Sequence, residues 1–288
     1  MKTLNEIRAG FIGSGAMGGA LIKAASRVID GGRIFITSRT GETSARLAAA
    51  LGVTKAEDND FLIRVCDTVF LAVKPRQLPA VLREIAPLCA GKILVSVAAG
   101  ITLASIRAEL ESASDAAPPD ALIRVMPNIA AGIGEGMTAL AVEKVPPAST
   151  GIIEEAAALV TGLLAPSGLV ERVNEDLMDC VTAISGSGTA YGFIFIEALA
   201  DAAVSLGMRR SAAYTFAAQT LKGAAAMVLE SGQHPAALKD AVCSPAGTTI
   251  EAVRVLESGG FRASIIEAAL SAACKARALA EESLRNRN

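Results

Sequence analysis

Residues 8–22 read RAGFIGSGAMGGALI, in which a short apolar run passes at once into a glycine-rich turn and then into helical spacing. The run Arg8 to Ile12 predicts a buried strand, and the helix is expected to continue through Ile22 and Val28. A strand, a turn and a helix in direct succession form the repeating unit of an open, mostly parallel sheet. This stretch therefore predicts an α/β fold.

The turn itself matches a dinucleotide-binding fingerprint. Gly13 permits a tight bend, Gly15 lets the backbone approach a pyrophosphate, and Gly18 allows the helix to press against the sheet. The bare pattern is often a plain turn, but here a strand precedes it and a helix follows, as the fingerprint requires. We expect nucleotide phosphates to meet the whole turn, formed by Gly13, Ser14, Gly15, Ala16, Met17 and Gly18.

Outward from this turn, short apolar runs alternate with helical patterns as far as residue 173. The runs expected to be strands are Ile34 to Thr37, Thr68 to Val73, Ile93 to Val97 and Leu122 to Met126, with Met137 to Val142 and Leu169 to Val173 near an edge. Pro146-Pro147 marks a break, and Ala148-Ser149-Thr150 is expected to begin a helix that ends near Leu164. Residues 1–173 are therefore predicted to form an α/β Rossmann-type doubly wound sheet.

From Asn174 onward the strand signal disappears, and residues 174–288 are predicted to form an all-α domain. We interpret three helical stripes in this half as core positions. The first contains Tyr191, Ile194, Phe195, Ala198, Leu199, Ala202 and Leu206; the second Tyr214, Ala218, Leu221, Ala225, Val228 and Leu229; the third Ile265, Ile266, Leu270 and Ala273.

The end of the second predicted strand bears on the choice of nicotinamide cofactor. Sites that prefer NAD usually place an acidic residue there to hold the ribose hydroxyls, whereas this chain has Ser38-Arg39-Thr40. A carboxylate would repel a 2′-phosphate, and an arginine with neighbouring hydroxyls binds one. Ser38 and Arg39 therefore favour NADPH over a weaker NADH; the alternative is that Arg39 is a solvated loop arginine.

A second informative stretch is Leu238 to Phe261, which reads LKDAVCSPAGTTIEAVRVLESGGF. Pro245 cannot continue a helix, and helical spacing resumes at Ile250 and is closed by Gly259-Gly260. Thr248 and Thr249 are therefore expected at a helix N-terminus, where free backbone N–H groups favour a carboxylate or phosphate. The alternative is an ordinary Ser/Thr cap without a ligand.

Composition excludes several classes of function. The 288 residues carry 27 basic and 29 acidic side chains, without the basic run of a nucleic-acid-binding protein. A single histidine, His234, excludes a histidine-rich metal site, and no metal is expected. The five cysteines show no disulfide framework, which fits reduced thiols in the cytoplasm. The apolar segment Ala190 to Leu206 is interrupted by Gly192, Glu197 and Asp201, so we do not expect a membrane span.

The segment from Leu238 closely resembles the signature of pyrroline-5-carboxylate reductases, L-K/R-D-x-V-x-S-P-G-G-T-T-I followed by V-L-E-x-G-G-F-R. The resemblance covers nearly the whole chain and includes FLAVKP at Phe70 to Pro75, SVAAGIT at Ser96 to Thr102, MPN at Met126 to Asn128 and SGSG at Ser185 to Gly188. It implies NADPH-dependent reduction of 1-pyrroline-5-carboxylate to L-proline, by an enzyme whose helical half forms an interlocked homodimer or a multiple of dimers. The protonated imine carbon is already electrophilic, so hydride transfer needs positioning and exclusion of water more than a strong acid or base.

The resemblance also implies roles for single residues. Thr249 would hydrogen-bond the ring nitrogen of the substrate, while Ser244 and the Gly247-Thr248 backbone would hold its carboxylate. The segment containing Asn128 would border the substrate. The implied cofactor-lining residues are Asn59, Ala72, Val73, Lys74 and Ala98.

The chain departs from the family pattern at three places. Ala246 stands where the family usually has glycine, which predicts an unusual backbone angle there. Ile129-Ala130 replaces Thr-Pro after MPN, and Thr189 replaces proline after SGSG. Both of these departures border the implied substrate, so the preferred cyclic imine is left open.

Two alternatives compete with this interpretation. A β-hydroxyacid dehydrogenase shares the GFIGSGAMGGAL start, but it places lysine and asparagine at positions that correspond to Gly192 and Ile196 here, so its acid/base lysine is missing. A non-catalytic NADP-binding regulator would keep the cofactor domain and use its helices for partners. The intact Ser244 to Thr249 loop argues against such a regulator.

The helical half is also expected to dimerise on physical grounds. Its alanine-rich helices offer few large side chains, and aromatic residues make up 3% of the chain. One copy would then close its core poorly, and a second copy would cover stripes such as the one with Ile265 and Leu270. A self-contained helical bundle is the alternative.

Overall fold

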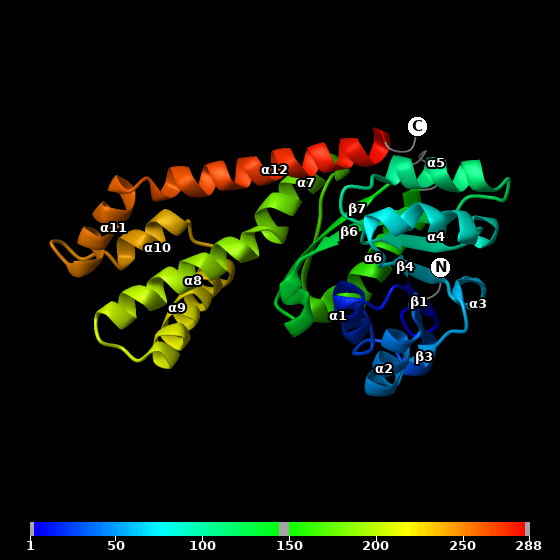
Figure 1. Cartoon of the computed structure of the whole chain (residues 1–288), viewed down its shortest axis with the longest axis horizontal. Coiled ribbons are helices and arrows are strands. Elements are labelled where there is room, and N and C mark those ends of the chain that lie inside the picture. The colour runs from blue at the N-terminus through cyan, green and yellow to red at the C-terminus, as the bar shows by residue number, and fades with distance from the viewer. Residues whose placement is uncertain (1–2, 144–149, 286–288) are drawn as a thin grey trace. The chain divides into compact units, whose positions relative to one another are not determined.

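The computed structural model of the chain describes residues 3–143 and 150–285. Within these residues, eight strands form one sheet in the order β3-β2-β1-β4-β5-β6-β7-β8 (Figure 1). Their bounds are β1 Ala9–Ile12, β2 Ile34–Thr37, β3 Thr54–Lys55, β4 Thr68–Leu71, β5 Ile93–Ser96, β6 Ala121–Pro127, β7 Gly136–Val142 and β8 Gly168–Arg172. The predicted doubly wound sheet is confirmed, and its first strand lies between β2 and β4.

Two features of the sheet were not predicted. The short strand β3 pairs in parallel with β2, and two residues are too few to show a periodic pattern. Strand β7 runs antiparallel to β6, whereas every other pairing in the described sheet is parallel. The reversal follows from the short connection between β6 and β7, which holds only a turn of 3-10 helix, Ile129–Ile133, and no crossover helix.

Helices cover both faces of the sheet. Strand residues alternate between two apolar cores: Phe11 and Phe70 face the core formed with α1, α2 and α6, whereas Ile12 and Leu71 face the core formed with α3, α4 and α5. Phe11 and Phe70 are register partners and stack with ring centroids 4.5 Å apart. The helices are α1 Ala16–Ala25, α2 Glu42–Leu51, α3 Asn59–Val65, α4 Leu78–Ile85, α5 Leu103–Ala113 and α6 Thr150–Leu164.

Helix α1 ends earlier than predicted, whereas helix α6 ends where it was predicted to end. Helix α1 ends at Ala25, three residues before Val28, because the Arg27 and Val28 N–H groups donate to the carbonyls three residues back and tighten the last turn. Helix α6 ends at Leu164 as predicted. The expected break at Pro146-Pro147 and the expected helix start at Ala148-Ser149 lie outside the described residues.

The chain divides into two compact units, one of residues 1–186 with 273–288 and one of residues 187–272. The change from strands to helices falls earlier, between Arg172 and Glu175. The helices after this change are α7 Met178–Val181, α8 Gly188–Ser205, α9 Arg210–Ser231, α10 Pro235–Ala241, α11 Thr248–Ser258 and α12 Phe261–Arg285. The described residues after Arg172 form helices and connecting turns without a strand, so this half is all-α, as predicted.

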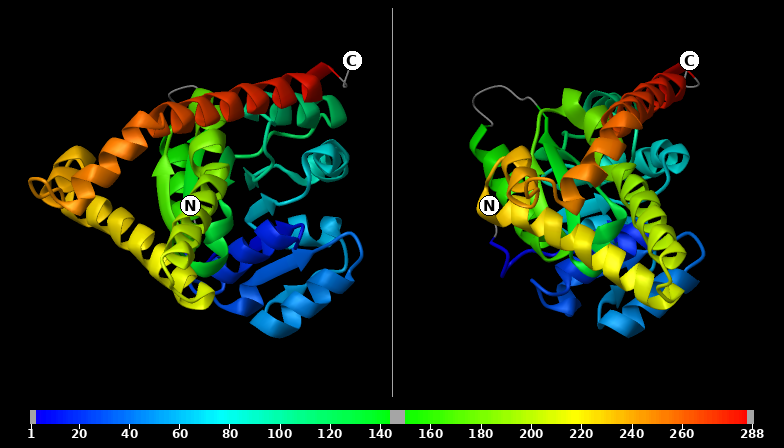
Figure 2. Two further views of the ribbon diagram at one scale, coloured as in Figure 1. Left: turned by 60° about the vertical axis from the view of Figure 1, so that its left-hand side comes forward. Right: turned by 90° about the vertical axis from the view of Figure 1, so that its left-hand side faces the viewer.

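In the second unit, α8 and α9 pack along each other (Figure 2). The residues buried between them are small, namely Ala200, Ala213 and Ala217, with Ile196 and Val204 packed around them. The interpretation of the predicted stripes as the core of one chain is therefore wrong. Ile194 is 65% exposed and Leu270 is 55% exposed. Alanine faces let two helices approach closely, and the larger side chains consequently point outward.

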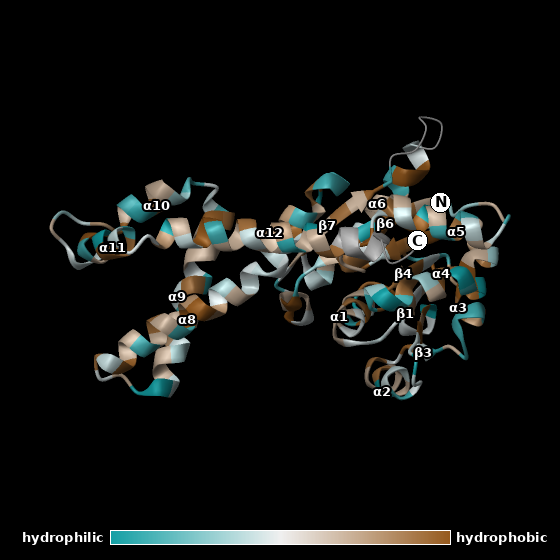
Figure 3. Cartoon of the chain, turned by 45° about the horizontal axis from the view of Figure 1, so that its top comes forward, coloured by the Kyte–Doolittle hydropathy of each residue, from teal (hydrophilic) through white to brown (hydrophobic). Residues whose placement is uncertain are grey.

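The helices of the C-terminal half therefore carry many apolar residues whose side chains are exposed (Figure 3). Judged by length and composition alone, the helical run Glu175–Ser205 is apolar enough to cross a membrane, with a mean hydropathy of 1.2 in its most apolar window. The expectation that this segment is not a membrane span therefore stays a prediction.

Candidate functional site

The glycine-rich turn is shaped by close backbone approaches that exclude side chains. Gly13 has a left-handed φ of +106°, and an ideal Cβ on it would lie 2.5 Å from the Ala72 carbonyl oxygen. A Cβ on Gly18 would lie 2.1 Å from the Gly13 carbonyl oxygen. Both residues must therefore be glycine for α1 to begin directly above β1 and β4.

Ser14 and Gly15, which lie between these two glycines, have polar groups that are available to a ligand. An ideal Cβ on Gly15 would meet no atom within 4 Å, so the backbone there faces open space. Ser14 is 4% exposed, and its buried hydroxyl has no hydrogen-bond partner among the described residues. Buried polar atoms are nearly always hydrogen-bonded, so an unpaired hydroxyl beside an open backbone fits an absent polar ligand. Together with the N-terminus of α1, these groups fit a pyrophosphate.

The end of β2 carries the predicted cofactor-selecting residues. Ser38 is tied to the start of α2, because its Oγ donates to the Ser44 Oγ at 3.0 Å and accepts from the Ser44 N–H at 3.1 Å. Arg39 lies in the exposed turn, and within the described residues no hydrogen bond or ion pair engages its guanidinium. Asn59 accepts from the Thr37 hydroxyl at 2.7 Å and donates to Glu84 at 3.0 Å. Asn59 thereby links the end of β2 to α4.

The ends of β4 and β5 bring the next cofactor candidates to the same edge of the sheet. Ala72 and Val73 follow β4, and Lys74 is exposed at the start of the 3-10 turn Pro75–Gln77. Ala98 follows β5 and is buried, and its N–H donates to the Ser96 Oγ at 3.3 Å. Parallel strands end at one edge, so these residues and the glycine turn share one face of the first unit.

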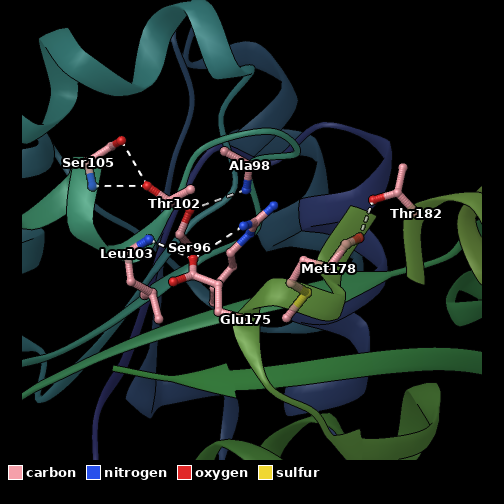
Figure 4. A network of polar contacts seen from close by, with 9 residues as sticks. Ser96, Ala98, Thr102, Leu103, Ser105, Glu175, Met178 and Thr182 are labelled. Carbon is pink, nitrogen blue, oxygen red and sulfur yellow. Dashed lines mark hydrogen bonds and ion pairs between the residues drawn. The ribbon is translucent and has the colours of Figure 1, made fainter. Parts of the chain in front are cut away.

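A polar network fixes the turn after β5 (Figure 4). Thr102 caps α5 by accepting from the Ser105 N–H at 3.1 Å, and the Leu103 N–H donates to Glu175 at 2.7 Å. Glu175 also pairs with the buried Arg124 of β6 at 3.2 Å. The carboxylate therefore joins the start of α5 to the centre of the sheet and limits movement of the turn that holds Ala98.

This network borders the cavity of about 700 Å³ that includes Gly100, Thr102, Arg124 and Glu175 in its lining. The cavity lies in the first unit, and its lining includes Glu143, which pairs with Arg107 outside the lining, and Arg172, which pairs with Glu154 outside it. The Glu143 carboxylate raises the pKa of Arg107 by a direct hydrogen bond. The arginines are therefore already neutralised by protein carboxylates.

Asn128 directly follows β6, and its side chain is hydrogen-bonded at both its oxygen and its nitrogen. Its Oδ1 accepts from the Met137 N–H at 3.3 Å, and its Nδ2 donates to the Ser185 carbonyl at 3.2 Å. Ser185 lies in a turn of π-helix, Thr182–Gly186, and its buried hydroxyl has no partner among the described residues. Asn128 therefore holds this turn beside β7, and its direct contact with substrate stays a prediction. Turns of π-helix occur often at functional sites.

The second unit holds the loop Ser244–Thr249. Thr248 begins α11 and Thr249 follows it, as predicted, and Gly247 is the N-cap with no side-chain cap. The Ser/Thr-cap interpretation is therefore wrong, because the N-cap position belongs to a glycine. Within the described chain no hydrogen bond engages either threonine hydroxyl, and Thr249 is half-buried.

Two backbone features shape this loop. Ala246 has a left-handed φ of 56°, and no other non-glycine residue of the described chain has a positive φ. The predicted unusual angle is confirmed, at a cost of about 1 kcal/mol for a residue with a Cβ. The Ser244 carbonyl accepts from the Gly247 N–H at 3.0 Å, and a Cβ on Gly247 would lie 2.4 Å from the Ser244 Oγ. The loop therefore folds back over Gly247.

Cysteine and histidine take structural positions. Burial raises the pKa of the Cys66 and Cys89 thiols to about 12, which makes both poor nucleophiles. Cys243 is half-buried next to the loop and unpaired. His234 caps α10 by accepting from the Ala236 N–H at 3.2 Å. Groups of three or more potential metal-binding side chains are absent from the described residues.

The structure thus gathers the predicted cofactor residues along one edge of the sheet and the predicted Ser244–Thr249 residues at one helix start. Sequence reasoning missed Lys55 of β3, whose Nζ would lie 3.5 Å from a Cβ on Gly41, two residues after Arg39 in the chain. It also missed Glu175 and the unpaired Ser185. Only Ser185 had a sequence signal, because it lies in the SGSG motif.

Comparison with known proteins gives a family match in each half of the chain. The family described as "Pyrroline-5-carboxylate reductase dimerisation" matches residues 175–279, and the family described as "NADP oxidoreductase coenzyme F420-dependent" matches residues 8–100. The pyrroline-5-carboxylate reductase of Escherichia coli (strain K12) is 42% identical over 266 residues, which cover 91% of this chain and 94% of the relative.

Solved structures show the same likeness over nearly the full length. A pyrroline-5-carboxylate reductase from Coxiella burnetii superposes with a TM-score of 0.84 at 32% identity, covering 96% of this chain and 99% of that one. The Plasmodium falciparum pyrroline carboxylate reductase, solved with NADP bound, gives a TM-score of 0.78 at 30% identity, covering 96% of this chain and 99% of that one.

Two glycine substitutions separate ligand binding from folding in the turn. Gly15→Ala adds a methyl group to open space, so we expect an unchanged melting temperature but cofactor binding weakened by about tenfold or more. Gly18→Ala forces the start of α1 away from Gly13, so we expect a loss of stability of roughly 1–3 kcal/mol. Thermal unfolding and cofactor titration measure the two effects. A stable Gly15→Ala protein with full affinity would contradict the assignment of this space to a pyrophosphate.

Proposed function

The chain belongs to the pyrroline-5-carboxylate reductase family, and on that premise we propose how its residues reduce 1-pyrroline-5-carboxylate to L-proline with NADPH. Family membership removes the β-hydroxyacid dehydrogenase alternative, which already lacked its lysine at Gly192. The assignment of roles depends on two separate sets of polar groups without a side-chain partner in the described protein. One is the open glycine turn with its unpaired Ser14 hydroxyl, and the other is the uncapped start of α11.

The cofactor residues of the first unit bind and orient the nicotinamide nucleotide. NADPH supplies a hydride to the electrophilic imine carbon when it is bound. Ser14 and the backbone of Gly13–Gly18 hold the pyrophosphate, and the turns at Ala72–Lys74 and Ala98 line the remainder of the nucleotide. The Glu175 contacts keep the Ala98 turn in place, so that orientation is set before substrate arrives.

The loop of the second unit binds the substrate. The backbone N–H groups at the start of α11 and the Ser244 hydroxyl hold the carboxylate, because a helix N-terminus favours an anion. The half-buried Thr249 hydroxyl contacts the ring nitrogen and orients the C=N bond. Neither contact needs a strongly basic group, which agrees with a loop that holds only serine, proline, alanine, glycine and threonine residues.

NADPH is the preferred cofactor in this proposal. Arg39 is exposed with no described ionic partner, and the strand end that carries it has no carboxylate. A free guanidinium attracts the 2′-phosphate that distinguishes NADPH from NADH. NADH remains a weaker substrate because every other contact is shared.

The helical half is proposed to form a homodimer, or a multiple of dimers. Residues 175–279 match the family's dimerisation region, and this region carries large exposed apolar side chains such as Phe193, Phe216 and Leu270. A second copy would bury them, which also accounts for the apolar run Glu175–Ser205 without a membrane. The five free cysteines fit a cytoplasmic location.

Thr249→Val tests the catalytic assignment, because valine keeps the shape of threonine and removes the hydroxyl. We expect kcat/KM to fall by roughly 100-fold while the protein folds and binds NADPH normally. Thr215→Val on the exposed surface of α9 is the matched control. Unchanged turnover in Thr249→Val would reduce Thr249 to a spacer.

Arg39→Ala tests the cofactor preference. NADPH binding should weaken by roughly 1–3 kcal/mol, the scale of a charged hydrogen bond, with little change for NADH. Equal losses for the two cofactors would refute contact with the 2′-phosphate. Binding titrations with each cofactor measure both quantities.

Dilution tests the dimer. We expect light scattering to give the mass of a dimer or larger assembly, and activity to fall together with that mass as the protein is diluted, because the helical surfaces lose their cover. A folded and fully active monomer would contradict the proposal.

A further inference from the structure

We propose that Lys55 is a second cationic ligand of the cofactor's 2′-phosphate and that it shares this group with Arg39. The inference rests on the proposed NADPH preference and adds to it a residue that lies 16 positions further along the chain, on another strand.

Strand pairing brings Lys55 to the cofactor edge of the sheet. Strand β3 is parallel to β2, and Lys55 is the register partner of Ile36. The Ala56 N–H donates to the Ile36 carbonyl at 3.0 Å, which fixes the end of β3 against the end of β2. Because parallel strands end at the same edge, Lys55 lies beside the turn that carries Ser38 and Arg39.

The ammonium group is directed at that turn. An ideal Cβ on Gly41 would lie 3.5 Å from the Lys55 Nζ and 3.8 Å from its Cε, so the side chain extends over the Gly41 backbone. Gly41 has a left-handed φ of +68°, and its N–H donates to the Ser38 carbonyl at 3.1 Å. Lys55 thus reaches the Gly41 end of the short turn that begins at Ser38 and contains Arg39.

Neither cation is already neutralised. Within the described residues, no hydrogen bond or ion pair engages the Lys55 ammonium or the Arg39 guanidinium, and both side chains are exposed. The carboxylates nearest in sequence are Glu42 at the start of α2 and Glu57 after β3. An approaching phosphate would be repelled by these carboxylates, so one arginine alone would give a weak site. Two cations at the same turn offset that repulsion and attract a dianion more strongly than one.

The inference predicts a defined selectivity. NADPH and 2′,5′-ADP carry the 2′-phosphate, whereas NADH does not. Removing the charge of Lys55 should weaken binding of NADPH and 2′,5′-ADP by about three- to tenfold and leave binding of NADH unchanged. Lys55→Glu should weaken NADPH more than Lys55→Met does, because it adds repulsion to the loss of a cation.

The test is calorimetric titration of the full-length protein and its Lys55→Met, Lys55→Glu and Arg39→Ala variants with NADPH, NADH and 2′,5′-ADP. Arg33→Met is the matched control, since it removes one exposed charge at the opposite end of β2. Melting temperatures show whether each variant is folded. The expected result is weaker binding of NADPH and 2′,5′-ADP to Lys55→Met, normal binding of NADH, and no selective change in Arg33→Met.

Three outcomes overturn the inference, and they are distinguishable. Unchanged NADPH affinity in Lys55→Met, with a selective loss in Arg39→Ala, rejects Lys55 and leaves the proposed cofactor preference standing. Equal losses of NADPH and NADH in Lys55→Met assign the lysine a structural role instead. Equal affinity of the unmodified protein for NADPH and NADH rejects the cofactor preference and the role of Lys55 together.

Discussion

The contact between the backbones at Gly13, Gly18 and Ala72 governs the arrangement of the first unit. With no side chain at either glycine, α1 starts directly after β1, at the edge where the parallel strands β1, β4 and β5 end. The strands' apolar alternation then buries Phe11 and Phe70 on one face and Leu71 on the other. A methyl group at Gly18 would collide with the Gly13 carbonyl, so this packing has little tolerance.

The two units are proposed to bind charged ligands in different ways. In the first, the proposed contacts to a nucleotide with several phosphates come from backbone N–H groups, a buried hydroxyl and exposed cations, while the buried Arg124 is paired with Glu175. In the second, the proposed contacts to a small carboxylate-bearing ring come from a helix start and hydroxyl groups alone. Hydride transfer to an electrophilic imine suits this division, because positioning contributes more than acid or base strength.

The exposed apolar surface of the helical half has a simple physical origin. Ala200, Ala213 and Ala217 form the contact between α8 and α9, and such small residues bury little area per contact. The larger side chains on the same helices, including Ile194 and Leu229, are left on the surface of one chain. The match of residues 175–279 to a dimerisation family agrees with a surface that a second copy covers.

Local pattern alone determined much of this protein: the main strands in their order along the chain, the glycine-rich turn at Gly13–Gly18 and the helix start at Thr248. Each of these depends on residues adjacent in sequence, whose backbone preferences act without distant partners. Only the tertiary structure decided the antiparallel β7, the outward direction of the Ile194 stripe and the approach of Lys55 to Gly41. These features depend on pairing between segments far apart in the chain, where packing and strand register override local propensity.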